Sequence, residues 1–273
     1  MKKIPIGVFD SGYGGLTILA ELLKKMPDYD YVYFGDNARA PYGNRSFDVV
    51  YSYTLEAVDF LFKQGCELII IACNTASAKA LRTIQQTDLP RYGTNKRVLG
   101  VIRPCTEYIG QVTNSNSIGI LGTEGTVNSN SYPIELKKFF PSLHVAQHAC
   151  PMWVPLIENN MHNTEAGKLI IKSDIEGFLS ENPTIDALVL ACTHYPVLLD
   201  YIKQLVGETV QVVPQGEIVA DKLVDYLARH EKLNATLSKG GSVDYYTSEN
   251  SVFFDEAAAT FLHRKIQSQH IAL

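Results

Sequence analysis

Short apolar runs alternate along the chain with longer stretches whose apolar residues recur every three or four positions. In the first third, apolar runs cover 4–9, 31–34 and 68–72, and aspartate, glycine or cysteine follows each run directly. Helical spacing is present between them, over 16–23 and 58–62. Strands that alternate with helices of this length form βαβ units, which build parallel sheets. The pattern therefore predicts an α/β fold.

The same alternation starts again near Val98 and continues to the end of the sequence. Strands are predicted within 98–102, 117–122, 143–150, 186–196 and 209–214. Helices are predicted at about 130–140, 164–180, 197–206 and 216–230. A polar loop over 234–242, a strand from Val243 and a helix from about Asp255 complete the chain.

The second series of elements repeats features of the first. "IGVFDSGYGG" begins at Ile6, and "IGILGTEGT" begins at Ile118. In each half a later strand closes on the dipeptide Ala-Cys, at Cys73 and at Cys192. We expect two related α/β halves.

Polar residues gather where these strands end. Asp10-Ser11, Cys73-Asn74-Thr75 and Cys192-Thr193-His194 each follow an apolar run directly. Ligands of open parallel sheets bind at the carboxyl ends of the strands. The helix N-termini that follow favour anions and lower the pKa of a thiol. These segments are therefore the candidate site.

Two thiols at matching places indicate proton transfer at a stereocentre. One group removes a proton from one face of a carbon while the other returns a proton to the opposite face, and the reverse reaction exchanges their roles. This chemistry is typical of a racemase or epimerase. A zinc site of Cys73, Cys192 and His194 is an alternative, although Cys-x-His lacks the paired spacing of structural zinc sites. The remaining cysteines are expected to be small buried residues: Cys66, Cys105 and Cys150.

Composition narrows the class of protein. The 273 residues suffice for one large or two ordinary domains, and the 46% apolar fraction predicts a sizeable core. The net charge of −5 and the scattered basic pairs argue against a nucleic-acid surface. No apolar run reaches 18 residues, so no membrane span is expected. Five cysteines without a secretory signal indicate reduced thiols in the cytoplasm.

Four motifs, in order, carry a closer resemblance: "FDSGYGGL", "GDNARAPYG", "ACNTA" and "ACTHYP". They resemble the glutamate racemase family, within the aspartate/glutamate racemase superfamily, over nearly the whole chain. The resemblance implies two pseudo-symmetric lobes, each with a mainly parallel sheet flanked by helices, and an active site in the cleft between them. The first lobe would comprise 1–97 plus 210–273, and the second 98–209.

The resemblance also implies an activity, the interconversion of L- and D-glutamate for peptidoglycan synthesis, without pyridoxal phosphate or metal. Cys73 and Cys192 would be the acid and base, assisted by Asp10 and His194. The implied substrate contacts are Asp10, Ser11, Tyr42, Gly43, Asn74, Thr75, Thr193 and His194. The resemblance further implies that the protein is a cytoplasmic homodimer that binds neither nucleic acid nor membranes.

Several alternatives stay open at this point. An aspartate racemase would use the same cysteines, and inhibition of a DNA topoisomerase, as in some relatives, would be a non-catalytic role. Asp10 is either a site residue or the cap of the helix from Leu16. Glu158 is either a partner of the second thiol or a surface carboxylate. "DSGYGG" lacks the last glycine of a dinucleotide loop, and Arg39 is assigned no role in binding a carboxylate.

Overall fold

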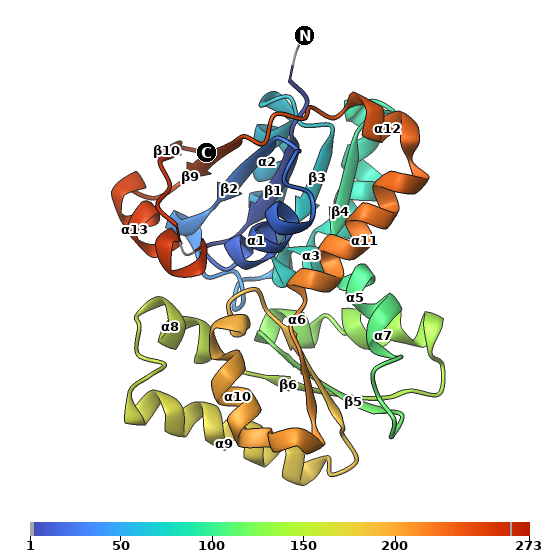
Figure 1. Cartoon of the computed structure of the whole chain (residues 1–273), viewed down its shortest axis with the longest axis vertical. Coiled ribbons are helices and arrows are strands. Elements are labelled where there is room, and N and C mark those ends of the chain that lie inside the picture. The colour runs from blue at the N-terminus through green and yellow to red at the C-terminus, as the bar shows by residue number, and fades with distance from the viewer. Residues whose placement is uncertain (1–2, 263) are drawn as a thin grey trace.

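Two parallel sheets, each flanked by helices, form two lobes along the long axis of the molecule (Figure 1). The computed structural model describes residues 3–262 and 264–273. The first lobe has a six-stranded sheet in the order β10-β9-β2-β1-β3-β4, and the second a four-stranded sheet in the order β6-β5-β7-β8. The predicted α/β fold with two lobes is confirmed.

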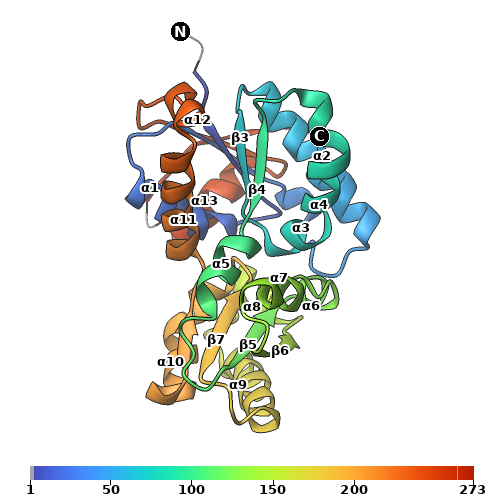
Figure 2. The ribbon, with the colours of Figure 1, turned by 90° about the vertical axis from the view of Figure 1, so that its right-hand side faces the viewer.

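The first sheet consists of β1 (Ile6–Asp10), β2 (Tyr31–Gly35), β3 (Leu68–Ile71), β4 (Arg97–Gly100), β9 (Val243–Thr247) and β10 (Ser268–His270). Its helices are α1 (Gly15–Lys25), α2 (Phe47–Lys63), α3 (Asn74–Lys79), α4 (Leu81–Thr83), α11 (Gly216–Arg229), α12 (Glu231–Thr236) and α13 (Ser251–Leu262), with the short turns η1 (Asn37–Arg39), η2 (Ile84–Asp88) and η3 (Leu89–Tyr92). α1 and α11 lie side by side over one face of the sheet, and α2 lies on the other (Figures 1 and 2).

The second sheet consists of β5 (Ser117–Gly122), β6 (His144–Ala149), β7 (Ala187–Ala191) and β8 (Gln211–Val213). Its helices are α5 (Ile102–Ile109), α6 (Glu124–Asn128), α7 (Ser131–Phe139), α8 (Trp153–Glu158), α9 (Glu165–Glu181) and α10 (Leu199–Val206), with the turns η4 (Tyr195–Leu198) and η5 (Gly207–Thr209). Figure 2 shows α5 at the junction of the lobes, where it packs against α7 and α11.

The two sheets share one strand order. β2-β1-β3-β4 and β6-β5-β7-β8 each place their strands in the sequence second, first, third, fourth, and all pairs are parallel. The repeat of Ile6-Gly7 at Ile118-Gly119 falls on the equivalent strands β1 and β5. The predicted relation between the halves is therefore present in the topology.

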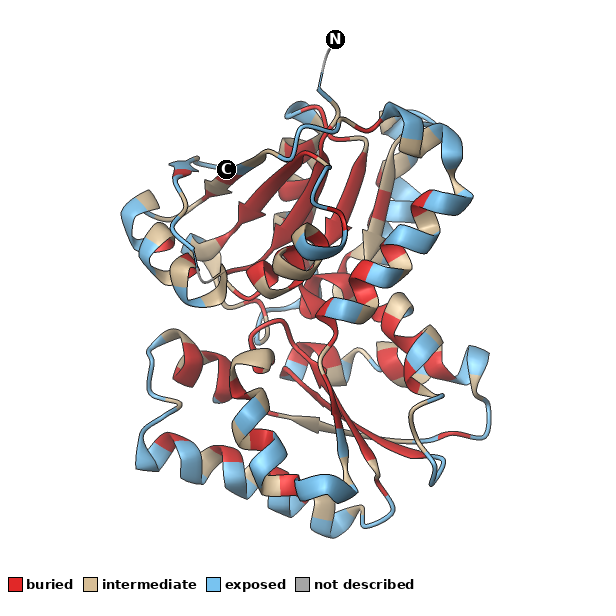
Figure 3. Ribbon diagram, in the orientation of Figure 1, coloured by how far each residue is buried: buried red, intermediate tan, exposed pale blue. Residues whose placement is uncertain are grey.

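The central strands are apolar along their length because helices cover both faces of each sheet. β1, β2, β3, β5 and β7 are buried at every residue (Figure 3). An edge strand such as β6 is only half-buried over most of its length. A continuous apolar run thus marks the strands that end at the centre of each sheet, where the polar motifs follow.

Two predicted strands do not lie in the lobes that the predicted domain boundaries give them. The strand predicted over 98–102 is β4, which pairs with β3 in the first sheet. The segment predicted over 209–214 contains β8, which pairs with β7 in the second. By sheet membership the chain crosses after Gly100 and after Val213, whereas the predicted domain boundaries follow residues 97 and 209. An apolar run identifies a strand but not its partner.

The predicted helices agree with α7, α9, α10 and α11 to within two residues. α13 begins at Ser251 rather than Asp255, since the side chain of Asn250 accepts a hydrogen bond from the Val252 amide. Part of the loop predicted over 234–242 belongs to α12. In the described part of the chain, no helix is long and apolar enough to cross a bilayer.

Two leucines of the second lobe test where its stability resides. Leu190 in β7 is fully buried, whereas Leu169 on α9 is 66% exposed. We expect Leu190→Ala to lower the free energy of unfolding by about 2–5 kcal/mol, because it leaves a cavity. The matched Leu169→Ala should change it by less than about 0.5 kcal/mol. Denaturation in urea measures both, and similar losses would contradict the assignment of β7 to the core.

Candidate active site

A cavity of about 160 Å³ lies where the strand ends of the two lobes meet. Of the predicted site residues, the following line it: Ser11, Tyr42, Gly43, Cys73, Asn74, Thr75, Cys192, Thr193 and His194. The lining also includes residues without a predicted role, among them Thr123, Glu124, Cys150, Val154 and Pro155. Both lobes therefore contribute to one site.

The two thiols occupy equivalent places in the two lobes. Cys73 follows β3 and Cys192 follows β7, the third strand of each sheet. In this strand order the reversal point lies between the first and third strands, where parallel sheets open a ligand crevice. Both side chains border the cavity but are only 5% and 7% exposed. A molecule in the cavity would meet one thiol from each lobe.

Cys73 is held as a neutral thiol. Its Sγ accepts a hydrogen bond from the Ala76 amide at 3.4 Å, as the N-cap of α3, and lies 3.3 Å from Ser11 Oγ. Burial raises the pKa of Cys73 to about 12, and the negative charge of Asp10 adds to the increase. The bonds from Ser11 and Ala76 offset part of it. At neutral pH this sulfur carries a proton.

Cys192 has a cation beside it. His194 Nδ1 lies 4.0 Å from Cys192 Sγ, and His194 Nε2 lies 2.9 Å from Glu158 Oε1. Burial alone would lower the pKa of His194, but the contacts with Cys192 and Glu158 outweigh it and raise the pKa to about 10. An imidazolium next to sulfur stabilises the thiolate. Glu158, at the end of α8, is thus a cavity residue and not a surface carboxylate.

Asp10 does not line the cavity. Its fully buried carboxylate lies behind the wall, where it accepts hydrogen bonds from the Gly12 amide at 3.0 Å and from Thr193 Oγ1 at 3.2 Å. Burial raises the pKa of Asp10, although the nearby His194 opposes the increase. Asp10 joins a turn of the first lobe to the Thr193 segment of the second, and α1 has Gly14 rather than Asp10 as its N-cap.

The hydroxyl of Tyr42 is not free to bind a ligand. It donates to the carboxylate of Asp36, which also forms an ion pair with Arg39 Nε at 2.7 Å. Burial raises the pKa of Tyr42, and the charge of Asp36 raises it further. Tyr42 and Gly43 therefore offer the cavity a ring and backbone groups, while Arg39 lies outside the lining.

Hydrogen bonds between the lobes surround the site. Asn74 Nδ2 donates to Gln215 Oε1 at 2.7 Å, Tyr132 OH donates to Asn74 Oδ1 at 2.7 Å, and Gln215 Nε2 closes the ring with Tyr132 OH. Thr75 Oγ1 lies 2.9 Å from Thr123 Oγ1. The side chain of Asn74 is thus held from two sides, and its predicted place in the site is fixed by the second lobe.

Thr123 was not predicted, although the sequence contains a signal for it. When Ile118 is aligned with Ile6, Thr123 corresponds to Ser11, so each half supplies a hydroxyl after its first strand. Ser11 contacts Cys73, and Thr123 contacts Thr75 of the same α3 turn. Glu158 has no such signal, because its contact with His194 joins α8 to a distant strand end.

The zinc site considered for Cys73, Cys192 and His194 has no support in the geometry. Among residues 3–262 and 264–273, the His, Cys and carboxylate ligand atoms that approach one another within 4.8 Å as a group belong to His148, Cys150 and Asp174. The cavity thus offers thiols, hydroxyls, an imidazole and a carboxylate for acid–base chemistry.

Comparison with known proteins agrees with this geometry. The Asp/Glu/hydantoin racemase family model matches residues 16–223. The chain is 39% identical over 262 residues to a glutamate racemase from Geobacter metallireducens, which covers 96% of this chain and 93% of that protein.

Two solved structures are similar along their whole length. Glutamate racemase isoform RacE1 from Bacillus anthracis superposes with a TM-score of 0.90 at 33% identity, covering 100% of this chain and 99% of that one. A glutamate racemase from Francisella tularensis, solved with D-glutamate, gives 0.87 at 30% identity, covering 100% and 98%. With its paired thiols on one cavity and these relatives, the chain belongs to the Asp/Glu/hydantoin racemase family.

Proposed function

We propose that this protein is a glutamate racemase that uses Cys73 and Cys192 as its acid and base. The observation that carries the proposal is that two buried thiols from equivalent strand ends border one small cavity. The curated relatives are glutamate racemases, and one similar structure holds D-glutamate. The protein would supply D-glutamate for peptidoglycan in the cytoplasm, as a homodimer. Its predicted lobes, 1–97 plus 210–273 and 98–209, would have their boundaries moved to follow Gly100 and Val213, where the chain crosses between the sheets.

The proton balance uses both sulfurs in one turnover. The thiolate of Cys192 takes the Cα proton from one face, and the thiol of Cys73 delivers its proton to the opposite face. Cα ends with the inverted configuration, Cys192 ends as a thiol and Cys73 as a thiolate. The reverse reaction starts from that state, so the same pair serves both enantiomers.

In the ligand-free protein, the surroundings of the two thiols suit Cys73 as the acid and Cys192 as the base. Cys73, with a pKa of about 12, is the proton donor at neutral pH. Cys192 Sγ lies 4.0 Å from Nδ1 of His194, whose pKa is raised to about 10. Glu158 acts through His194: its carboxylate holds the imidazolium by a 2.9 Å hydrogen bond. Glu158 is therefore a positioning residue.

The carbanionic transition state needs stabilisation, because a Cα–H is far less acidic than a thiol. α3 begins at Asn74, and the first amides of a helix have no partner within it. Asn74 and Thr75 both line the cavity, and each such amide donor contributes on the order of 3 kcal/mol when it is preorganised. They would bind the substrate α-carboxylate as charge builds on it.

Replacement of either thiol tests the mechanism. We expect Cys73→Ser and Cys192→Ser each to lower the rate of racemisation by on the order of 10²–10⁴-fold, because a serine hydroxyl is a poor acid and base here. Cys66→Ser is the matched control, since Cys66 is also buried but lies outside the cavity lining. Loss of optical activity and incorporation of deuterium at Cα in D₂O are measured. Full activity in either site variant would reject the scheme.

The choice of substrate needs a direct comparison. We expect circular dichroism to follow racemisation of L-glutamate at a kcat/KM at least 100-fold above that of L-aspartate. The physical reason is that the shorter side chain leaves polar groups of the cavity unpaired. A preference for L-aspartate would make the protein an aspartate racemase, while leaving the two-thiol chemistry intact.

The role of Glu158 predicts a pH effect. Glu158→Gln removes the anion that stabilises the imidazolium, so the pKa of His194 should fall from about 10 toward its ordinary value. The cation would then be lost at lower pH, and the alkaline limb of the kcat/KM profile should move to lower pH. NMR titration of the His194 ring measures the shift. Glu165→Gln, at the exposed start of α9, is the control; equal effects of both would contradict the assignment.

A further inference from the structure

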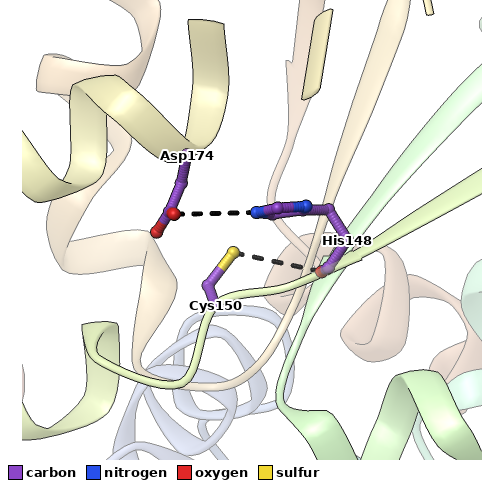
Figure 4. A group of neighbouring side chains, drawn as sticks. All are labelled: His148, Cys150 and Asp174. Atoms are coloured by element: carbon purple, nitrogen blue, oxygen red, sulfur yellow. Dashed lines mark hydrogen bonds and ion pairs between the residues drawn. The ribbon is translucent and has the colours of Figure 1, made fainter. Parts of the chain in front are cut away.

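A second group of reactive side chains lies in the second lobe, apart from the catalytic pair. His148, near the end of β6, and Cys150, just after it, face Asp174 on α9 (Figure 4). One ligand atom from each residue lies within 4.8 Å of the others, and His148 Nε2 is 3.7 Å from Asp174 Oδ1. Imidazole, thiolate and carboxylate are the three protein ligands that zinc takes.

Two of the three groups lack a strong partner. His148 Nε2 is shielded from solvent and makes no hydrogen bond to any described residue, since 3.7 Å to Asp174 is too long for one. The thiol of Cys150 has only a weak contact, 3.9 Å to the carbonyl of His148. A buried ring nitrogen is normally satisfied, so this nitrogen needs an explanation.

Neighbouring residues orient the group. Trp153 Nε1 donates to Asp174 Oδ2 at 2.7 Å, which leaves Oδ1 directed at His148. The ring of His148 stacks on Phe178, with centroids 5.3 Å apart. Metal sites typically fix their ligands by such outer contacts.

We propose that His148, Cys150 and Asp174 bind one zinc-class divalent ion through Nε2, Sγ and Oδ1, with water in the fourth position. Tetrahedral bonds of about 2.0–2.3 Å need ligand atoms roughly 3.3–3.7 Å apart. The ligand atoms lie within 4.8 Å of one another, so the group would contract by at most about 1 Å. On binding, the Cys150 S–H bond breaks, the metal–sulfur bond forms and the proton passes to water.

The group lies close to the surface, although His148 Nε2 is itself covered. The side chains of His148 and Asp174 are 33% and 26% exposed, while the thiol side is closed. Cys150 also borders the catalytic cavity, and its carbonyl accepts a hydrogen bond from Tyr195 OH at 3.1 Å. Cys150 is buried, as predicted, and the proposal adds a ligand role to it. The site does not depend on which amino acid the cavity takes.

The test uses the full chain with Cys73→Ser and Cys192→Ser, so that the catalytic thiols bind no metal. Zn²⁺ is titrated calorimetrically into the metal-free protein, and Co²⁺ binding is followed by the sulfur-to-cobalt charge-transfer absorption. We expect one ion per chain. His148→Gln, Cys150→Ser and Asp174→Asn should each weaken binding at least 10-fold, and Cys150→Ser should abolish the charge-transfer band.

Matched controls separate this site from adventitious binding. His144→Gln alters an exposed histidine on the same strand, and Cys66→Ser alters a buried thiol in the other lobe; both should bind as the parent does. Asp174→Asn retains a carbonyl that can accept the Trp153 hydrogen bond, so it loses the ligand without losing the packing. Absence of zinc binding, or binding that survives all three ligand variants, would mean that His148 and Asp174 form only an ion pair and would overturn the proposal.

Discussion

The site depends on one constraint of parallel sheets, which is that successive strands all end at the same edge. In both lobes the first and third strands are neighbours, and the chain leaves them in opposite directions at the sheet centre. The residues that follow those strands must therefore lie together at an open crevice. The carboxyl ends of the strands in one lobe face those in the other. Ser11 and Cys73 of one lobe therefore share a cavity with Thr123 and Cys192 of the other.

The halves are matched in topology but not in charge. Cys73 lies near the carboxylate of Asp10, which disfavours its thiolate, whereas Cys192 lies beside the cation of His194. A symmetric scaffold thus places two identical side chains next to groups of opposite charge. Only part of this difference arises outside the repeat: Asp10 belongs to the repeated segment, whereas Glu158 reaches His194 from α8. In the proposed mechanism, these surroundings would distinguish the proton donor Cys73 from its partner Cys192.

The sequence predicts the elements and the residues near each strand end because both depend on local pattern. The sequence predicts less well which strands pair with one another and which side chains are in contact. β4 and β8 were assigned to the wrong lobes, since pairing is decided by packing over the whole sheet. Asp10 was expected to contact substrate but is turned behind the wall, toward Thr193. The repeat in the sequence was enough to predict Thr123 as a site residue. The contact of Glu158 with His194 and the cluster at His148 join residues far apart in the sequence, so only the folded structure shows them.

The junction limits how the cavity can open. Asn74, Tyr132 and Gln215 satisfy one another in a buried ring that joins α3, α7 and the crossing before α11. Each buried polar group left without its partner costs about 1–3 kcal/mol. A motion that separates the lobes as rigid bodies would break the whole ring. Two further buried contacts join the lobes, from Thr193 Oγ1 to Asp10 Oδ2 and between the hydroxyls of Thr75 and Thr123. Separation of the lobes would therefore break several buried hydrogen bonds at once, which favours a junction that stays closed around the cavity.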